Sequence, residues 1–293
     1  EKQYFKKKFQ KKLFVVGHPK YDLLKKPFSK IFANRKKNLK KKFGNYIYFS
    51  SSFNFDTIGG YKQFILFTKK TYLTNKKNFI FFKKFLNYQK NDYKNYLLFL
   101  NTAKFIAEKF PKKNIILRPH PSQDIELVKK RFKNKPKNLH IIFENSFISW
   151  VKNCDFYIHS HCSTSIDAAL LKRKILRIIS NEKIEQEKNP INKYLGYTFK
   201  NEIMIYNYIA SVFNNEKVYN FKKNRISQNH IYNSGSKLSS IELAKFLKKT
   251  FKNKKSRLVL SQNENEIKKN YIYIFLDYIK RSVKKLISIY HIY

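Results

Sequence analysis

Cysteine is scarce in this 293-residue chain, in which Cys154 and Cys162 are the only two. They stand at the start of one predicted strand and in the turn after it, so we predict no disulfide, and the spacings typical of zinc ligands are absent. A reducing compartment is the simpler setting for such a chain. No run reaches the roughly 18 uncharged apolar residues of a membrane span, and the first residues show no signal peptide.

Acidic residues are also scarce, with 19 Asp and Glu against 63 Lys and Arg, which gives a formal net charge of +44. Such a charge ordinarily indicates a nucleic acid, an anionic membrane or a polyanionic substrate. Glycine and proline number only 6 and 7, however, and Lys, Asn, Ile, Phe and Tyr are abundant, which is the set encoded by A/T-rich codons. We therefore attribute much of the lysine excess to an AT-rich genome, although the charge still attracts anions at low salt.

The length and a hydrophobic content of 42% are enough for one large or two modest domains with a true core. Apolar runs of strand length alternate with segments of helical periodicity and predict an α/β fold with a parallel sheet covered on both faces. Ligands of such sheets bind at the carboxyl ends of the strands. The predicted strands are 13–18, 46–50, 114–118, 139–143, 155–159 and 174–179. The predicted helices are 28–43, 92–110, 122–132, 147–152, 203–213 and 240–251. The segment 180–200 is predicted to be a loop.

Helical spacing also predicts which side chains face the core. In the helix at 28–43 the inner positions are Ile31, Phe32, Leu39 and Phe43, and Gly44 ends the helix. In the helix at 92–110 the inner positions are Tyr96, Leu97, Leu100, Ala103, Ala107 and Phe110, and Pro111 ends it. Residues 60–90 are dense in Phe and Lys and are expected to be helical as well.

The polar turn at 160–165 follows the predicted strand at 155–159 and leads into a helix. A strand that feeds a helix through a short turn directs free backbone N–H groups at one point, where the helix dipole also favours negative charge. We expect a phosphate there, held by Ser163, Thr164 and Ser165. The alternative is that Thr164 and Asp167 form a capping box that binds nothing.

A second motif, Arg118-Pro119-His120-Pro121, directly follows the predicted strand at 114–118. The two prolines hold the backbone extended, so that Arg118 and His120 are presented at the edge of the sheet. Arginine offers a permanently charged planar fork for phosphate oxygens, and histidine donates a hydrogen bond or a proton near neutral pH. Together the two motifs predict a phosphate site with cations from one loop and amides from the other.

Other chemistry is not supported by the sequence. His159 and His161 have no cluster of carboxylates beside them in the chain, so no metal site is predicted. Cys162 lacks the neighbouring base that a nucleophile needs, and we interpret it as a small residue in a tight turn. Trp150 is expected in the core.

The segment at 263–293 has an apolar helical face and a rim of lysine and arginine. This pattern fits a helix that lies on an anionic membrane surface, and it also fits a terminal helix packed on the core of the protein. Basic amphipathic helices arise readily in so lysine-rich a chain, so both interpretations stay open.

The order of the motifs resembles the bacterial surface carbohydrate (capsule and polysaccharide) biosynthesis proteins, relatives of the capsule glycosyltransferases and of the CDP-glycerol glycerophosphotransferases. The resemblance covers residues 13–250. It is carried by these motifs in sequence: Gly17-His18-Pro19-Lys20-Tyr21-Asp22, Tyr46 through Phe53, Arg118-Pro119-His120-Pro121-Ser122, Ile148-Ser149-Trp150, and Asp155 through Leu170.

The resemblance implies a GT-B arrangement of two Rossmann-like lobes, with the nucleotide donor held by the C-terminal lobe. Residues 1–22 would then end the first, acceptor lobe, 23–45 would form a linker helix, 46–262 the donor-binding domain and 263–293 the basic amphipathic helix. Because this chain opens on Glu1 instead of Met, we expect it to be a fragment that lacks most of the acceptor lobe.

Carried over by position, the resemblance implies that Arg118, His120, Ser163, Thr164 and Ser165 bind the phosphate of the donor. Asp167, where the family more often has Glu, would contact the nucleotide ribose, and Ser51, Ser52 and Asn54 would contribute to the nucleotide site. The resemblance names no catalytic base for this chain. Neither a metal nor a cofactor is expected besides the nucleotide-sugar substrate.

The expected function is transfer of a sugar from a nucleotide-activated donor, a CMP-sugar by resemblance, to a surface glycan or lipid-linked acceptor. The setting would be cytoplasmic, peripheral on the anionic inner membrane. One alternative is a glycerophosphotransferase-type polymerase that uses a CDP-alcohol. The other is a basic membrane- or RNA-binding protein without a reaction, although the glycine-aromatic signatures of RNA-binding modules are missing.

Overall fold

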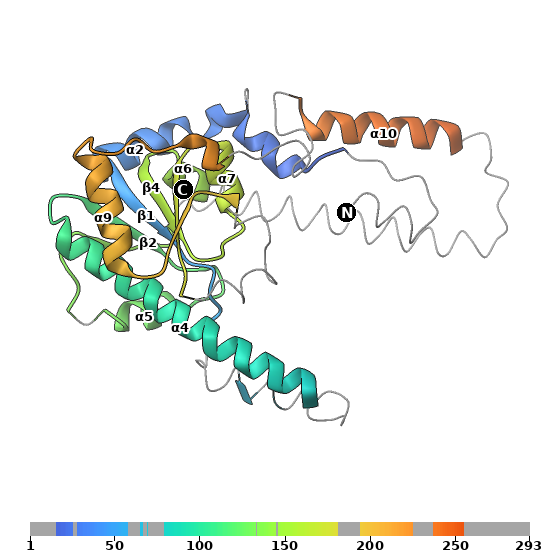
Figure 1. The fold of residues 1–293 in the computed structure, drawn as a ribbon. Helices are drawn as coiled ribbons and strands as arrows, with labels where there is room; N and C mark the ends of the chain where they lie inside the picture. The colour runs from blue at the N-terminus through green and yellow to red at the C-terminus, as the bar shows by residue number, and fades with distance from the viewer. Residues whose placement is uncertain are drawn as a thin grey trace. The chain divides into compact units, whose positions relative to one another are not determined.

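A computed structural model describes residues 16–25, 28–57, 65–66, 69, 79–132, 134–144, 146–180, 194–224 and 237–254. The chain divides into two compact units, Glu1–Ser240 and Ile241–Tyr293. The first unit contains the sheet and its helices (Figure 1). Of the second unit the structure describes only the greater part of one helix, α10 (Ser239–Lys254).

The first unit is built on a six-stranded parallel sheet with the order β3-β2-β1-β4-β5-β6. The chain moves outward from β1 on one side and from β4 on the other, which is the doubly wound, Rossmann-like order. This result confirms the predicted α/β fold class. The strands are β1 (Tyr46–Ser50), β2 (Asn114–Arg118), β3 (Leu139–Ile141), β4 (Cys154–His159), β5 (Lys174–Ile178) and β6 (Tyr197–Phe199).

Helices cover both faces of the sheet (Figure 1). One face packs through Ile47 and Phe49 of β1 against α4 (Phe79–Lys109), α5 (Ile125–Lys130) and α9 (Glu202–Phe213). The other face packs through Tyr46 and Tyr48 against α2 (Ala33–Phe43), α6 (Phe147–Val151) and α7 (Ser165–Leu170). Since alternate residues of a strand face opposite sides, β1 carries apolar side chains at every position before Ser50.

Three short 3₁₀ helices complete the described part of the chain: η1 (Pro19–Leu24), η2 (Phe28–Phe32) and η5 (Phe221–Asn224). The carboxylate of Asp22, in η1, accepts the backbone N–H groups of Ser239 at 2.9 Å and Ser240 at 2.7 Å. These are among the N–H groups that a helix start leaves unpaired. The side chain of Asp22 therefore caps the first turn of α10.

Most predicted strands and helices lie where the sequence placed them, and the differences have physical reasons. The 180–200 segment was predicted to be a loop, but its end forms β6, which pairs with β5. Ile31 is 61% exposed because it lies in η2, where the α-helical spacing used to place it does not hold. Leu97, predicted to face inward, is 37% exposed on α4. Trp150 is buried as predicted.

Four predicted segments fall partly or wholly outside the described residues: 13–18, 60–90, 180–200 and 263–293. Of the helix expected at 60–90, residues 65, 66, 69 and 79–90 are described, and they are helical. Of the strand predicted at 13–18, only 16–18 are described, and they are not in a strand. The amphipathic helix predicted at 263–293 lies outside the described residues. Within the part of the chain that the structure describes, no helix is long and apolar enough to cross a membrane.

Candidate functional site

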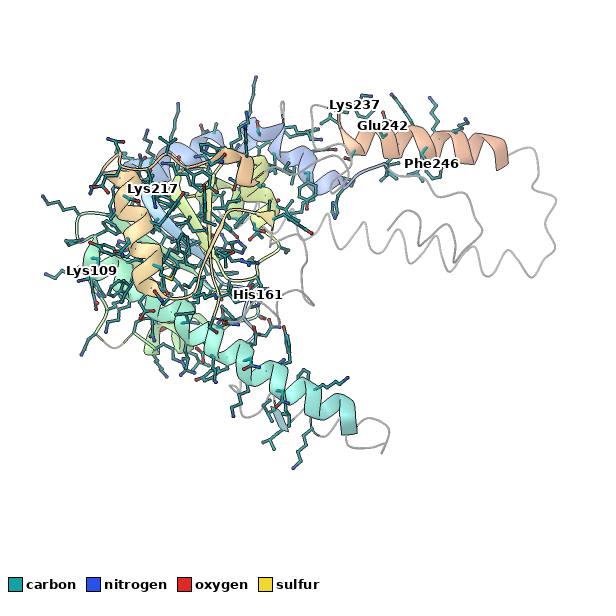
Figure 2. The ribbon with its side chains drawn as sticks, viewed as in Figure 1. Lys109, His161, Lys217, Lys237, Glu242 and Phe246 are labelled. Atoms are coloured by element: carbon teal, nitrogen blue, oxygen red, sulfur yellow. The ribbon has the colours of Figure 1, made fainter. Side chains whose placement is uncertain are left out.

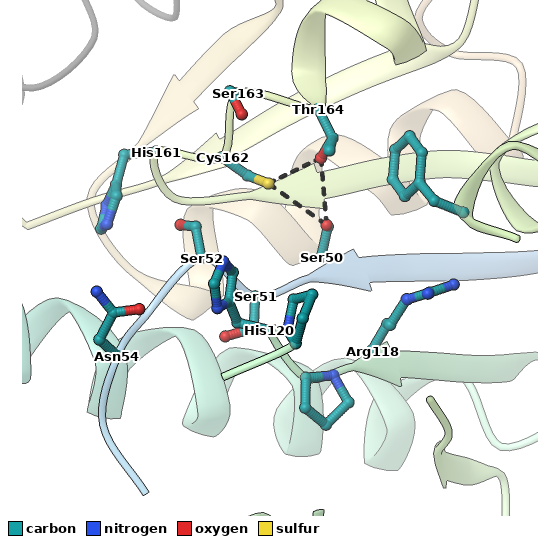
Figure 3. Close-up of a pocket in the computed structure, with 13 residues that line it drawn as sticks. Ser50, Ser51, Ser52, Asn54, Arg118, His120, His161, Cys162, Ser163 and Thr164 are labelled. Carbon is teal, nitrogen blue, oxygen red and sulfur yellow. Dashed lines mark hydrogen bonds between the residues drawn. The ribbon is translucent and has the colours of Figure 1, made fainter. Parts of the chain in front are cut away.

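A cavity of about 450 Å³ opens at the carboxyl edge of the sheet (Figure 3). The loops after β1, β2 and β4 form its walls, because β1 lies between β2 and β4 and all three strands run parallel. Ser50 is paired in register with both Arg118 and His159, so the three loops start at the same level. The order of the sheet reverses between β1 and β4, and ligands of doubly wound folds bind at such a switch point.

Seven of the nine predicted site residues line this cavity: Ser51, Ser52, Asn54, Arg118, His120, Ser163 and Thr164. Ser165 and Asp167 do not. Both are buried in α7, one and three residues after the turn. Six further residues line the cavity that the sequence did not single out for the site: Ser50, Pro119, Pro121, Phe147, His161 and Cys162.

Arg118 is the last residue of β2, and its guanidinium lies over the ring of Phe143, 5.0 Å from the ring centre. An arginine stacked on an aromatic face is held in orientation while it keeps its charge. The structure thus presents a permanent cation at one wall of the cavity (Figure 3). No carboxylate is among the lining residues that the structure describes.

His120 is held by the residue two positions further along. Its Nδ1 lies 2.7 Å from the hydroxyl oxygen of Ser122 and accepts the backbone N–H of Ser122 at 3.2 Å. Because Nδ1 accepts that N–H, the proton of the neutral ring lies on Nε2, which can donate to a ligand. Burial lowers the pKa of His120 below its usual value of 6.5, so the ring is neutral at pH 7.

The floor of the cavity is a cluster of hydroxyl and thiol groups. The Thr164 hydroxyl lies 2.7 Å from the Tyr157 hydroxyl, 2.7 Å from the Cys162 sulfur and 3.4 Å from the Ser50 hydroxyl. Burial raises the pKa of Tyr157 well above its usual value, so its phenol keeps the proton. The hydrogen bond with Tyr157 therefore fixes the Thr164 side chain at the floor of the cavity.

The capping box considered for Thr164 and Asp167 is wrong. The Thr164 side chain makes no capping hydrogen bond, since its hydroxyl is used in the floor of the cavity. Asp167 instead accepts from the ammonium group of Lys20 at 2.8 Å through its Oδ2. Burial raises the pKa of Asp167 and outweighs the opposite effect of Lys20. Its other oxygen, Oδ1, is buried without a hydrogen-bond partner among the described residues.

The backbone N–H groups of the turn are partly used within the turn itself. Ser165 N–H donates to the Cys162 carbonyl at 3.1 Å, and Ile166 N–H donates to the Ser163 carbonyl at 3.2 Å. The helix that follows, α7, has only six residues, so its dipole is small. Hydroxyl groups, His120 and Arg118 therefore provide more of the polar lining than the predicted amides do.

His161 lines the cavity on the side nearer α4 and pairs with Asp92 of that helix. Its Nε2 lies 3.5 Å from Asp92 Oδ1, its Nδ1 lies 3.2 Å from the Ser160 hydroxyl, and its ring packs edge-on against Phe53. Burial lowers the pKa of His161 to about 4 and raises that of Asp92 to about 7. The His161 ring is therefore neutral at pH 7. No sequence pattern indicates this pair, since 69 positions of chain separate Asp92 from His161.

His159, the neighbouring histidine, lies outside the cavity lining. It is completely buried, and neither ring nitrogen has a hydrogen-bond partner within the described part of the chain. Burial lowers its pKa well below the usual value, with Arg177 of the next strand acting in the same direction. Among the residues the structure describes, no three histidine, cysteine or acidic side chains gather in a way that could hold a metal ion.

The site thus belongs to a Rossmann-like sheet with a polar, cationic cavity at its switch point. No family model matches the chain, and no curated protein matches it. Similar folds occur among solved structures. A variant of the wall teichoic acid polymerase TagF is 13% identical with a TM-score of 0.49, and the match covers 87% of this chain and 57% of that one.

Two UDP-GlcNAc 2-epimerases are similar in the same way. The enzyme from Methanocaldococcus jannaschii, in complex with UDP-GlcNAc and UDP, is 16% identical with a TM-score of 0.43 over 80% of this chain and 54% of that chain. The enzyme from Neisseria meningitidis, bound to UDP-GlcNAc, is 11% identical with a TM-score of 0.41. The match covers 78% of this chain and 51% of that chain. This chain spans about half the length of each of these proteins.

Proposed function

We propose that this chain is the nucleotide-donor-binding part of a glycosyltransferase of surface polysaccharide synthesis. The observation that carries the proposal is the meeting of Arg118, His120, Ser163 and Thr164 around one cavity at the switch point of the sheet. Two motifs that are 40 positions apart in the chain contribute these residues. Their combination offers a fixed cation, a neutral N–H donor and hydroxyl groups to an anionic ligand.

The charge of the lining favours a donor with a single phosphate. Arg118 is the one permanently charged side chain among the described lining residues, and His120 and His161 are neutral at pH 7. A CMP-linked sugar carries one phosphate diester, whereas a CDP-alcohol carries two phosphates. One cation balances one phosphate charge, which supports the CMP-sugar suggested by the sequence resemblance over the CDP-alcohol.

In this proposal the catalytic contribution of the chain is electrostatic. When the bond between sugar and phosphate breaks, negative charge develops on the leaving phosphate. Arg118 and the Nε2 proton of His120 would stabilise that charge in place, without reorganisation of solvent. The acceptor, a surface glycan or lipid-linked sugar, and the catalytic base would be held by a further lobe. We place the complete enzyme on the cytoplasmic face of an anionic membrane.

Binding of CMP, measured by isothermal titration calorimetry, tests the donor site. Loss of a hydrogen bond to a charged group weakens binding by roughly 10- to 100-fold, so we expect Arg118→Met to lower CMP affinity by that factor. Lys109→Met is the matched control because it removes the same charge at the end of α4, distant from the cavity. Figure 2 shows Lys109 and Lys217 far from His161, which lines the cavity.

The control variant should change CMP affinity by less than about twofold. Equal losses in Arg118→Met and Lys109→Met would mean that the net charge of +44, and not the cavity, attracts the nucleotide. The reaction itself is tested by product analysis with CMP-sugar and CDP-alcohol donors. A new glycosidic bond supports the proposal, and a new phosphodiester bond replaces it with glycerophosphotransfer.

A further inference from the structure

Gln123 joins two of the loops that line the cavity, the loop at 51–57 after β1 and the loop at 119–124 after β2. Its side-chain Oε1 accepts from the Ser51 hydroxyl at 2.7 Å and from the backbone N–H of His120 at 2.8 Å. Its Nε2 donates to the Phe55 carbonyl at 2.9 Å and to the Tyr96 hydroxyl at 3.3 Å. All four hydrogen-bonding positions of the amide are therefore used. We call these five residues the Gln123 clasp.

The orientation of the amide in the clasp is set by its partners. The Tyr96 hydroxyl donates to Asp56 Oδ2 at 2.6 Å, so it can only accept from Gln123. The Phe55 carbonyl is also an acceptor, which requires a donor on that side of the amide. The Ser51 hydroxyl and the His120 N–H are donors and require an acceptor on the other side. A glutamine supplies both, whereas a glutamate of the same size supplies acceptors only when ionised.

An ion pair between Arg131 and the buried Asp56 holds the partner residue Tyr96, whose hydroxyl donates to Asp56. Arg131 donates to the two carboxylate oxygens of Asp56 at 2.7 and 3.0 Å, and Asp56 is buried with a left-handed backbone (φ 57°). The Asp56 carbonyl accepts the backbone N–H of Asp124, next to Gln123, at 2.8 Å. The clasp is therefore joined to Arg131 through Tyr96 and Asp56.

We propose that Gln123 is the positioning residue of this site, which holds the backbone of His120 so that its ring faces the cavity. Gln123 does not line the cavity and acts through His120 and Ser51, both of which do. The relevance of this role to nucleotide binding rests on the proposed function. The geometric claim concerns the free chain and is tested without any ligand.

The variant Gln123→Glu separates positioning from general stability. When its carboxyl group is protonated it keeps an acceptor oxygen and supplies one O–H donor in place of the two N–H donors of glutamine. When ionised it places a negative charge beside His120 and loses the donors to Phe55 and Tyr96. NMR titration of the His120 ring should therefore give a higher pKa than in the wild type. The other titratable or charged groups that face this position are Asp56, Tyr96 and Arg131, and all are unchanged in the variant.

The second measurement is the affinity for CMP. At each pH the affinity of the variant is divided by that of the wild type. At pH 8 we expect Gln123→Glu to bind about tenfold more weakly, since two hydrogen bonds of the clasp are lost or reversed. The ratio should rise toward one below about pH 4, where a carboxyl group of ordinary pKa, about 4.3, becomes mostly protonated. Gln123→Ala has no such group, so its loss of affinity should not depend on pH in this way.

Asn138→Asp is the matched control. The Asn138 amide donates to the carbonyls of Ala107, Phe110 and Lys113 at the opposite edge of the sheet, so this variant also places a carboxylate against carbonyl groups. It should lower stability and leave the pKa of His120 unchanged. Equal His120 pKa values in Gln123→Glu and the wild type overturn the positioning role. If that pKa shifts while the wild-type chain binds no CMP, the positioning role stands and the proposed function fails.

Discussion

Asp92 and His161 should give the folded chain two pH dependences that oppose each other. The ordinary pKa values are 3.8 for aspartate and 6.5 for histidine, and burial moves them to about 7 for Asp92 and about 4 for His161. Both side chains are almost fully buried, at 7% and 5% exposure, with 3.5 Å between Asp92 Oδ1 and His161 Nε2. With these pKa values the pair holds one proton between about pH 4 and about pH 7, on the carboxyl group of Asp92.

The sign for each group follows from linkage. The pKa of Asp92 is raised on folding, so its contribution to stability is complete below pH 3.8 and is lost as the pH rises to about 7. The pKa of His161 is lowered, so its contribution is complete above pH 6.5 and is lost as the pH falls to about 4. At about 1.4 kcal/mol for each pH unit, these are changes of about 4 and about 3 kcal/mol in opposite directions.

The free energy of unfolding in urea, measured between pH 4 and pH 7, tests this reasoning. In Asp92→Asn only His161 remains, and stability should rise across this range relative to the wild type. In His161→Asn only Asp92 remains, and stability should fall. The stability of the wild type should change less with pH than that of either variant, because the opposing contributions of Asp92 and His161 nearly cancel. Parallel curves for all three proteins would refute the reasoning, since every other titrating group is common to them.

Two further variants test the edges of the sheet. Gly196 has φ of 75°, and a Cβ added there would lie 2.1 Å from a backbone oxygen of β5. Gly44 has φ of 62°, but no atom lies within 4 Å of a Cβ added there. We therefore expect Gly196→Ala to lower the free energy of unfolding in urea by about 1–3 kcal/mol more than Gly44→Ala does. An equal cost would show that β6 does not pack against β5 as described. Thr164→Val leaves the Tyr157 hydroxyl without its 2.7 Å partner and should lower the free energy of unfolding by about 1–3 kcal/mol, whereas Thr164→Ser should not. Equal losses of stability in Thr164→Val and Thr164→Ser would contradict this prediction, because Thr164→Ser keeps the hydroxyl that binds Tyr157.

Sequence pattern alone predicted the strands that carry the site. β1 and β2 lie at their predicted residues, and β4 starts one residue early, because buried parallel strands appear as short apolar runs bounded by polar turns. The order of these runs implied parallel strands, and parallel strands end at one edge. That inference predicted that Arg118, His120 and Thr164 meet at one site, and all three line the same cavity.

Local pattern failed where a distant neighbour decides the conformation. β6 has only three residues and exists because β5 offers it a free edge, with Gly196 allowing the close approach. Thr164 and Asp167 have the spacing of a capping box, which was the alternative considered for them, but Tyr157 and Lys20 bind those side chains instead. Such competition among partners depends on packing and leaves no periodic signal in the chain.

Strand periodicity and turn chemistry are local properties of the chain, so they predicted five of the six strands, the level at which these strands end and the two motifs that face each other there. The contacts of Gln123 with His120 and of Asp92 with His161 came only from the folded structure. Those contacts join loops and a helix through side chains whose positions depend on how the helices pack against the sheet.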